Sequence, residues 1–135
     1  MSLGRILIVD DEEGIRKSVK FLLTKAGYDV VEAQDGEEGV QAIKSGDNPL
    51  LVDAIICDMQ MPNVNGMEAI GFFRQQFPMV PVIVMTGNPD PKDRDILLKE
   101  GVVEYLAKPV LPEQLTQAVE KATKQHQQCK DRSQT

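Results

Sequence analysis

Short apolar runs in this sequence are each followed at once by side chains that could do chemistry: Asp10 and Asp11, then Asp58, Thr86 and Lys108. Runs of this length, rich in Val and Ile, are typical of buried strands. The carboxyl ends of parallel strands lie at one edge of a sheet, where ligands bind. We therefore expect three carboxylates, a hydroxyl and a lysine to meet at that edge.

Such a cluster suits a divalent cation and a phosphoryl group. Neighbouring carboxylates repel one another and stay ionised together only if a cation neutralises them. Oxygen ligands with a partly open shell suit Mg²⁺, which keeps waters and often shares a phosphate. Lys108, Thr86 and the backbone N–H of Gly87 could donate to phosphoryl oxygens. Asp58 is then the candidate nucleophile, because carboxylates form aspartyl phosphates and phosphoryl transfer depends on positioning and charge neutralisation.

The elements that must position these groups alternate along the chain. Val- and Ile-rich runs predict strands over residues 5–9, 28–33, 53–57, 81–85 and 103–107. Apolar residues at helical spacing predict helices over residues 13–26, 37–44, 67–77, 91–100 and 112–125. We expect a loop over residues 45–52, Asp35 as a helix cap, and a solvent-facing His126 on the last helix.

This alternation predicts a doubly wound α/β fold. Repeated strand–helix units give a five-stranded parallel sheet with helices on both faces. Right-handed crossovers favour the flavodoxin-like strand order 2-1-3-4-5. Ligands in such sheets bind at the switch point between strands one and three, which is where Asp10, Asp11 and Asp58 fall.

Composition and charge exclude several classes of protein. The 135 residues, 41% hydrophobic and 27% charged, indicate one domain over residues 4–126, followed by a polar tail or helix extension over 127–135. A net charge of −6 argues against direct nucleic-acid binding. No signal peptide or bilayer-length apolar stretch is visible, so we expect a cytoplasmic protein with no membrane partner. Cys57 and Cys129 give no disulfide framework, which fits a reducing compartment.

Four short motifs stand in order at the ends of the predicted strands: "VDDE" with Asp10 and Asp11, "DMQMPNVNG" with Asp58, "MTG" with Thr86, and "YLAKP" with Tyr105, Lys108 and Pro109. Over residues 5–126, this arrangement resembles a response-regulator receiver domain of two-component signalling. The resemblance covers nearly the whole chain.

The resemblance implies a role for most of these residues. Asp58 would accept a phosphoryl group from a phosphohistidine on a sensor histidine kinase or histidine phosphotransfer protein. Asp11 would bind Mg²⁺ directly and Asp10 mainly through water, with the backbone carbonyl of Gln60 as another ligand. Lys108 would pair with the phosphoryl group, and its bond to Pro109 would be a cis peptide, a form that is accessible to X–Pro bonds.

Thr86 and Tyr105 resemble the switch pair of the family, which would report phosphorylation to a downstream output protein or domain. Gly87 stands where the family usually has alanine, and "NPDP" at residues 88–91 places two prolines in a loop that often moves on activation. These departures bear on switching and on the choice of partner rather than on phosphate acceptance.

Two other classes of function remain open. A Mg²⁺-dependent phosphohydrolase with an aspartyl nucleophile, resembling the haloacid dehalogenase group, would carry a second Asp where this chain has Gln60. Release of phosphate from an added monoester would favour that class. A phosphate-independent interaction module with a receiver fold would keep its output without a phosphodonor. We expect instead a self-phosphorylating acceptor with slow autodephosphorylation, which is not a conventional enzyme.

Overall fold

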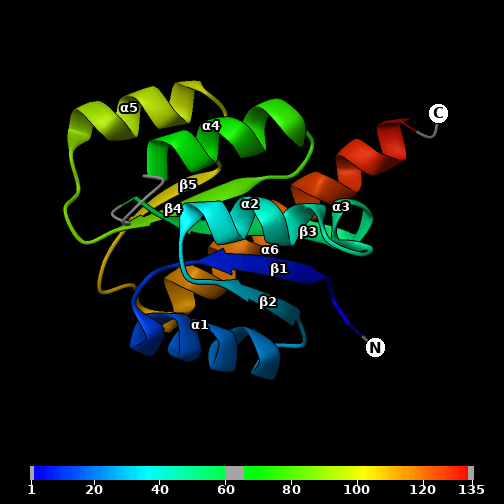
Figure 1. Cartoon of the computed structure of the whole chain (residues 1–135), viewed down its shortest axis with the longest axis horizontal. Coiled ribbons are helices and arrows are strands. Elements are labelled where there is room, and N and C mark those ends of the chain that lie inside the picture. The colour runs from blue at the N-terminus through cyan, green and yellow to red at the C-terminus, as the bar shows by residue number, and fades with distance from the viewer. Residues whose placement is uncertain (1, 60–65, 134–135) are drawn as a thin grey trace.

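Strands and helices alternate from an N-terminal strand to a long C-terminal helix (Figure 1). The computed structural model describes residues 2–59 and 66–133, with side chains described up to residue 128. The strands are β1 (Arg5–Val9), β2 (Asp29–Ala33), β3 (Val52–Asp58), β4 (Val82–Thr86) and β5 (Glu104–Ala107). The helices are α1 (Glu13–Lys25), α2 (Gly36–Lys44), α3 (Asn48–Leu51), α4 (Gly66–Gln76), α5 (Pro91–Lys99) and α6 (Pro112–Ser133).

Within the described part of the chain, the strands form one five-stranded parallel sheet in the order β2-β1-β3-β4-β5. This confirms the predicted doubly wound α/β fold and its flavodoxin-like strand order. Val9, the last residue of β1, pairs with Ala33 on one side and Cys57 on the other. Asp58 pairs with Met85 on β4. The register therefore brings the carboxyl ends of the strands to one edge.

Helices cover both faces of the sheet (Figure 1). On β1, Ile6 and Ile8 pack on the side of α1 and α6, whereas Leu7 and Val9 pack on the side of α2, α4 and α5. This division follows from the alternation of side chains along a strand. Because both faces are covered, the strands read as continuous apolar runs rather than as alternating ones.

The predicted loop over residues 45–52 contains a short helix instead. Helix α3 begins after Asp47, whose carbonyl accepts the amide of Leu51 at 3.0 Å. The Asn48 side chain donates to the carbonyl of Ala42 at 2.7 Å, and Pro49 suits the first helical turn because its φ is already set for it. The predicted loop therefore contains one short helix, which starts at Asn48 with Pro49 in its first turn.

Asp35 caps α2 as predicted, since its Oδ1 accepts the amide N–H of Glu38 at 2.8 Å. A side-chain acceptor at this position satisfies one of the amide groups that have no partner within the helix.

His126 does not face solvent, and that prediction is wrong. The side chain is 4% exposed, and its Nδ1 lies 2.9 Å from Oδ1 of Asp53 on β3. The other Asp53 oxygen accepts the amide N–H of Arg5 at 3.0 Å. His126 also continues the buried stripe of Val119 and Ala122 at helical spacing. Helix α6 continues to Ser133, which is the helix extension predicted as one alternative for the polar C-terminal residues, and its last turns extend past the strands (Figure 1).

We expect His126→Ala to lower the free energy of unfolding by about 1–3 kcal/mol, because it removes a buried hydrogen-bonding side chain and leaves a cavity. Urea denaturation followed by circular dichroism measures the change. Gln127→Ala, at the next and exposed position of α6, is the matched control and should stay within about 0.5 kcal/mol of the unmodified protein. Equal stabilities for the two variants would show that His126 does not anchor α6.

Candidate functional site

The carboxyl edge of the sheet brings predicted site residues from different strands together. Asp10 follows β1, Asp58 ends β3, Thr86 ends β4 and Lys108 follows β5. The side chains from β1, β3 and β4 are buried, with exposed fractions of 0% for Asp10, 1% for Asp58 and 1% for Thr86. Residues far apart in the sequence thus share one partly buried site because their strands are parallel and in register.

Lys108 joins the two buried carboxylates. Its Nζ lies 3.0 Å from Oδ2 of Asp10 and 3.2 Å from Oδ2 of Asp58. Burial alone would lower the pKa of Lys108, but the hydrogen bond to Asp10 and the charges of Asp10 and Asp58 outweigh it and raise that pKa above its ordinary value. Lys108 therefore stays protonated near neutral pH and offsets part of the negative charge of the site.

Four carboxylates form the acidic part of the site. Asp10, Asp11, Glu12 and Asp58 each offer an oxygen, and these oxygens lie within 4.8 Å of one another. Asp11 and Glu12 are exposed, so the cluster opens to solvent on one side. The ammonium of Lys108 balances only part of this charge, and carboxylate oxygens beside an open side suit Mg²⁺. The donor set fits the cation that the resemblance implies.

Glu12 joins this cluster although no role was predicted for it. It is the N-cap residue of α1, and its amide N–H donates to Oδ1 of Asp10 at 2.9 Å. This folds the loop back, and Oε1 of Glu12 comes within 3.4 Å of Lys108 Nζ. The signal in the sequence was the third acidic residue of "DDE". Gln60, predicted to offer its backbone carbonyl to the cation, lies outside the described residues.

The backbone of Asp58 is closely packed against the start of α4. The amide of Gly66 donates to the carbonyl of Met59 at 3.2 Å. A Cβ atom at Gly66 would lie 2.4 Å from Cα of Met59 and 2.7 Å from the carbonyl oxygen of Asp58. Only glycine fits at this distance, so α4 can begin directly beside the candidate nucleophile.

Cys57 packs in the core beside the site and takes no part in the cluster. Its burial, together with the charges of Asp58 and Asp10, raises the pKa of the Cys57 thiol. The side chain therefore stays a neutral thiol with a packing role.

The loops after β4 and β5 are tied together next to the cluster. The carbonyl of Thr86 accepts the amide N–H of Lys108 at 2.8 Å, and the Thr86 hydroxyl accepts the amide N–H of Asn88 at 3.1 Å. Gly87 lies exposed between these contacts. The peptide bond between Lys108 and Pro109 is cis, as predicted.

Tyr105 lies on β5 and contacts the loop after β4. It pairs in register with Val84, and its ring packs partly buried against the core on the side of α2, α4 and α5. Its hydroxyl oxygen accepts the amide N–H of Asp90, the N-cap residue of α5, at 3.1 Å. The ring is thus linked to the entry of α5.

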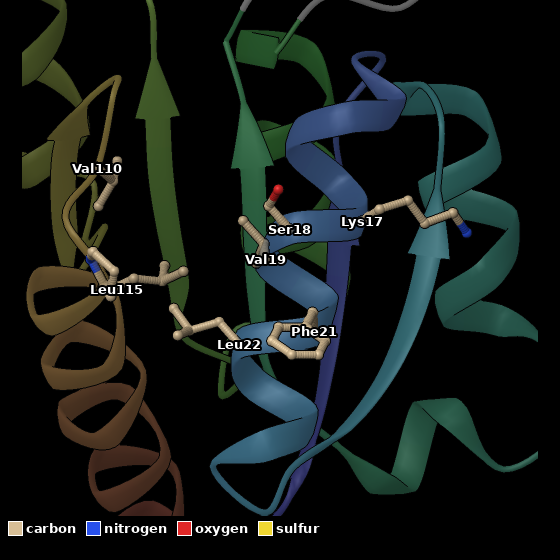
Figure 2. A pocket seen from close by; sticks show the side chains of 8 residues that line it. Lys17, Ser18, Val19, Phe21, Leu22, Val110 and Leu115 are labelled. Carbon is tan, nitrogen blue, oxygen red and sulfur yellow. The ribbon is translucent and has the colours of Figure 1, made fainter.

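An apolar groove leads from the site along the space between α1 and α6. The part next to the site, about 380 Å³, is lined by Glu12 and Lys108, and the adjoining part, about 420 Å³, is lined by Phe21 and Leu22. The two parts are continuous because they share lining residues: Ser18, Val19, Val110 and Leu115. Figure 2 shows Leu22 and Leu115 pointing towards each other across this α1–α6 groove. Phe21 is 69% exposed at its rim.

The family model for the response regulator receiver domain matches residues 6–120. The chain belongs to this family, whose members are the receiver domains of two-component signal transduction. Receiver domains generally use Mg²⁺ at an acidic site, and the described residues of this chain contain an acidic cluster at the corresponding edge of the sheet. No helix among the described residues combines the length and the apolar content needed to cross a membrane.

Relatives with different roles contain a similar segment. The chain is 34% identical over 115 residues to the alkaline phosphatase synthesis transcriptional regulatory protein PhoP of Bacillus subtilis, in a match that covers 85% of this chain and 46% of PhoP. It is 35% identical over 108 residues to the CAI-1 autoinducer sensor kinase/phosphatase CqsS of Vibrio cholerae, which covers 78% of this chain and 15% of CqsS. The chain thus spans less than half the length of either relative.

Solved receiver domains share the fold over nearly their full length. A response regulator receiver domain protein from Clostridium thermocellum superimposes with a TM-score of 0.87 at 34% identity, covering 94% of this chain and 99% of that one. A CheY-like receiver domain protein from Methanospirillum hungatei gives a TM-score of 0.84 at 30% identity, with the same coverage of 94% and 99%.

Proposed function

We propose that this receiver domain is a phosphorylation-dependent switch in which Asp58 accepts a phosphoryl group from a phosphohistidine. The observation that carries the proposal is the Lys108 ammonium 3.2 Å from Oδ2 of Asp58, inside a cluster of carboxylates that is open to solvent. A buried carboxylate beside a fixed ammonium is placed for phosphoryl transfer, in which positioning and charge neutralisation supply most of the catalysis.

In the proposed reaction, an oxygen of the ionised Asp58 carboxylate forms a bond to phosphorus while the bond from phosphorus to the donor imidazole nitrogen breaks. The imidazole nitrogen keeps the electron pair of that bond and takes up a proton. Lys108 donates to a phosphoryl oxygen, and the Thr86 hydroxyl and the Gly87 N–H are the further proposed donors.

The proposed cation ligands are Asp10, Asp11 and Asp58, with the Gln60 carbonyl as another and Glu12 at the open side of the cluster. A bound Mg²⁺ offsets the negative charge of the carboxylates and of the arriving phosphoryl group. Gln60 stands where an aspartyl phosphohydrolase would carry its acid/base residue. We therefore propose slow loss of the phosphoryl group rather than turnover on external phosphomonoesters.

Acetyl phosphate is expected to add one phosphoryl group to the chain, at Asp58, and only while Mg²⁺ is present. Intact-mass spectrometry with and without EDTA measures it. Asp58→Asn removes the nucleophile and should abolish labelling, whereas Asp35→Asn changes a carboxylate at the α2 cap and should leave labelling unchanged. Equal labelling of Asp58→Asn and the unmodified chain would refute the assignment of the nucleophile.

The proposed phosphodonor is a sensor histidine kinase or a histidine phosphotransfer protein that docks on the α1–α6 groove. A donor protein must bring its histidine to Asp58, and this groove ends at Glu12 and Lys108 beside that carboxylate. The exposed ring of Phe21 gives the rim an apolar contact point. The similarity to a segment of the sensor kinase/phosphatase CqsS supports a place in such a phosphotransfer pathway, and we propose that this takes place in the cytoplasm.

Phe21→Ala is expected to slow phosphotransfer from a donor protein about tenfold, as for a moderate interface contact, while leaving labelling by acetyl phosphate unchanged. The donor is a phosphorylated histidine phosphotransfer domain that labels the unmodified chain, and the transfer rates are measured by rapid quench. Leu98→Ala on α5, where the side chain is 38% exposed outside the groove, is the matched control. If Phe21→Ala and the control transfer at the same rate, the donor docks elsewhere.

We further propose that Thr86 and Tyr105 transmit phosphorylation to an output protein or domain. The Thr86 hydroxyl now accepts the amide N–H of Asn88 and would turn to donate to the new phosphoryl oxygens. The Tyr105 ring then moves into the vacated space and gives up its contact with the amide of Asp90 at the start of α5. A differential affinity of a few kcal/mol changes the ratio of the two states about a hundredfold.

Beryllofluoride with Mg²⁺ is expected to shift the ¹H–¹⁵N resonance of Asp90 as the Tyr105 hydroxyl leaves it. In Thr86→Ala the shift should be lost, because the hydroxyl that senses the phosphoryl group is absent. The amide of Glu38, which donates to the cap residue Asp35 at the start of α2, serves as the unchanged reference. An unshifted Asp90 in the unmodified chain would place the output on another surface.

A further inference from the structure

Arg16 on α1 joins the loop after β1 to strand β2. Its Nη1 donates to the backbone carbonyl of Asp10 at 2.8 Å, and its Nε donates to Oε1 of Glu32 at 3.1 Å. The Arg16 side chain is only 12% exposed and that of Glu32 only 17%. We propose that Arg16 is a positioning residue of the cation site, an inference that rests on the Mg²⁺ site of the proposed function.

The carbonyl that Arg16 binds belongs to the peptide group between Asp10 and Asp11. A peptide group is planar, so holding its carbonyl also restrains the amide and the Cα atom of Asp11, from which the Asp11 side chain starts. Within the described residues, no hydrogen bond or ion pair holds the Asp11 carboxylate, although one of its oxygens lies in the acidic cluster. Asp11 is therefore positioned through its backbone, and the Arg16 hydrogen bond to the Asp10 carbonyl is one of the contacts that hold this backbone.

The other polar atoms of Asp10 are held as well. Its amide N–H donates to the carbonyl of Ala33 at 3.1 Å, Oδ1 accepts the amide N–H of Glu12, and Oδ2 accepts from Lys108. Arg16 supplies the contact to the carbonyl, and it is a charged donor with a rigid planar fork. The amide, the carbonyl and both carboxylate oxygens of Asp10 are thus all held by other residues.

Glu32 gives Arg16 a fixed anchor on β2. Its Oε2 lies 3.0 Å from Nζ of Lys17 and 3.2 Å from Nζ of Lys20. Burial on its own would raise the pKa of Glu32, but the hydrogen bonds to Lys17 and Lys20 outweigh it, and the pKa lies below its ordinary value. Glu32 therefore stays ionised at neutral pH and keeps accepting from Arg16.

The charge of Arg16 and its positioning role have opposite effects on Mg²⁺ affinity. Removing a positive charge close to an acidic cluster strengthens the attraction of the cluster for a cation. Loosening an outer-shell contact weakens metal binding, by about 10–100-fold in known sites. A loss of affinity on removing Arg16 is thus the signature of positioning, because electrostatics alone predicts a gain.

The test is isothermal titration of Mg²⁺ into the unphosphorylated 135-residue chain and its variants, each checked for folding by circular dichroism. Arg16→Gln removes the charge and the fork, and Arg16→Lys keeps the charge but cannot donate to both acceptors as the fork does. Lys17→Gln is the matched control, since it removes the same charge and another partner of Glu32 while leaving the Asp10 carbonyl bonded.

Both Arg16 variants are expected to bind Mg²⁺ at least about tenfold more weakly, and Lys17→Gln to bind within about twofold of the unmodified chain. Arg16→Lys decides the matter if Arg16→Gln does not fold. Unchanged or tighter binding by the Arg16 variants overturns the inference, and so does an equal loss in Lys17→Gln. An unmodified chain that binds no Mg²⁺ overturns the proposed cation site itself and, with it, this inference.

Discussion

The ion pairs of Lys108 with Asp10 and Asp58 are the interaction on which the rest of the site depends. Two carboxylates this deeply buried would each cost several kcal/mol if they stood alone, and a close ammonium offsets much of that cost. The three side chains come from the ends of β1, β3 and β5, so they meet only while those strands remain parallel and in register. The arrangement leaves excess negative charge at an open edge, which is where the proposed cation and phosphoryl group would bind.

The residues around these ion pairs act mainly by fixing the position of the backbone, and they add few functional groups to the site. Gly66 lets α4 begin against the carbonyl of Asp58, and Arg16 holds the carbonyl of Asp10. Both act on main-chain atoms next to a carboxylate, where a small rotation would move the side chain out of the cluster. The loops after β4 and β5 are tied by the hydrogen bond between Lys108 and Thr86, and Tyr105 accepts from Asp90 at the start of α5, which is the proposed route from the site to that helix.

Sequence reasoning succeeded where the signal is local and failed where a side chain serves two elements. Val- and Ile-rich runs ended by polar residues identified all the strands of the described sheet and their order. His126 was predicted to face solvent on the last helix, yet it continues the buried stripe of α6 and contacts Asp53, a residue 73 positions away. Gly46 and Pro49 suggested a loop, but the Asn48 side chain bonds back to α2 and a helical turn forms at Asn48–Leu51.

The amino-acid sequence by itself determined the alternation of strands and helices, the parallel sheet and the set of residues at its carboxyl edge. Each of these follows from the apolar period of a segment and from the residue that ends it. Only the tertiary structure decided that Glu12 joins the acidic cluster, that Arg16 bonds the carbonyl of Asp10, and that a groove runs from the site between α1 and α6. These features depend on the direction of side chains and backbone carbonyls after distant segments have packed. That direction cannot be inferred from residue types and their spacing.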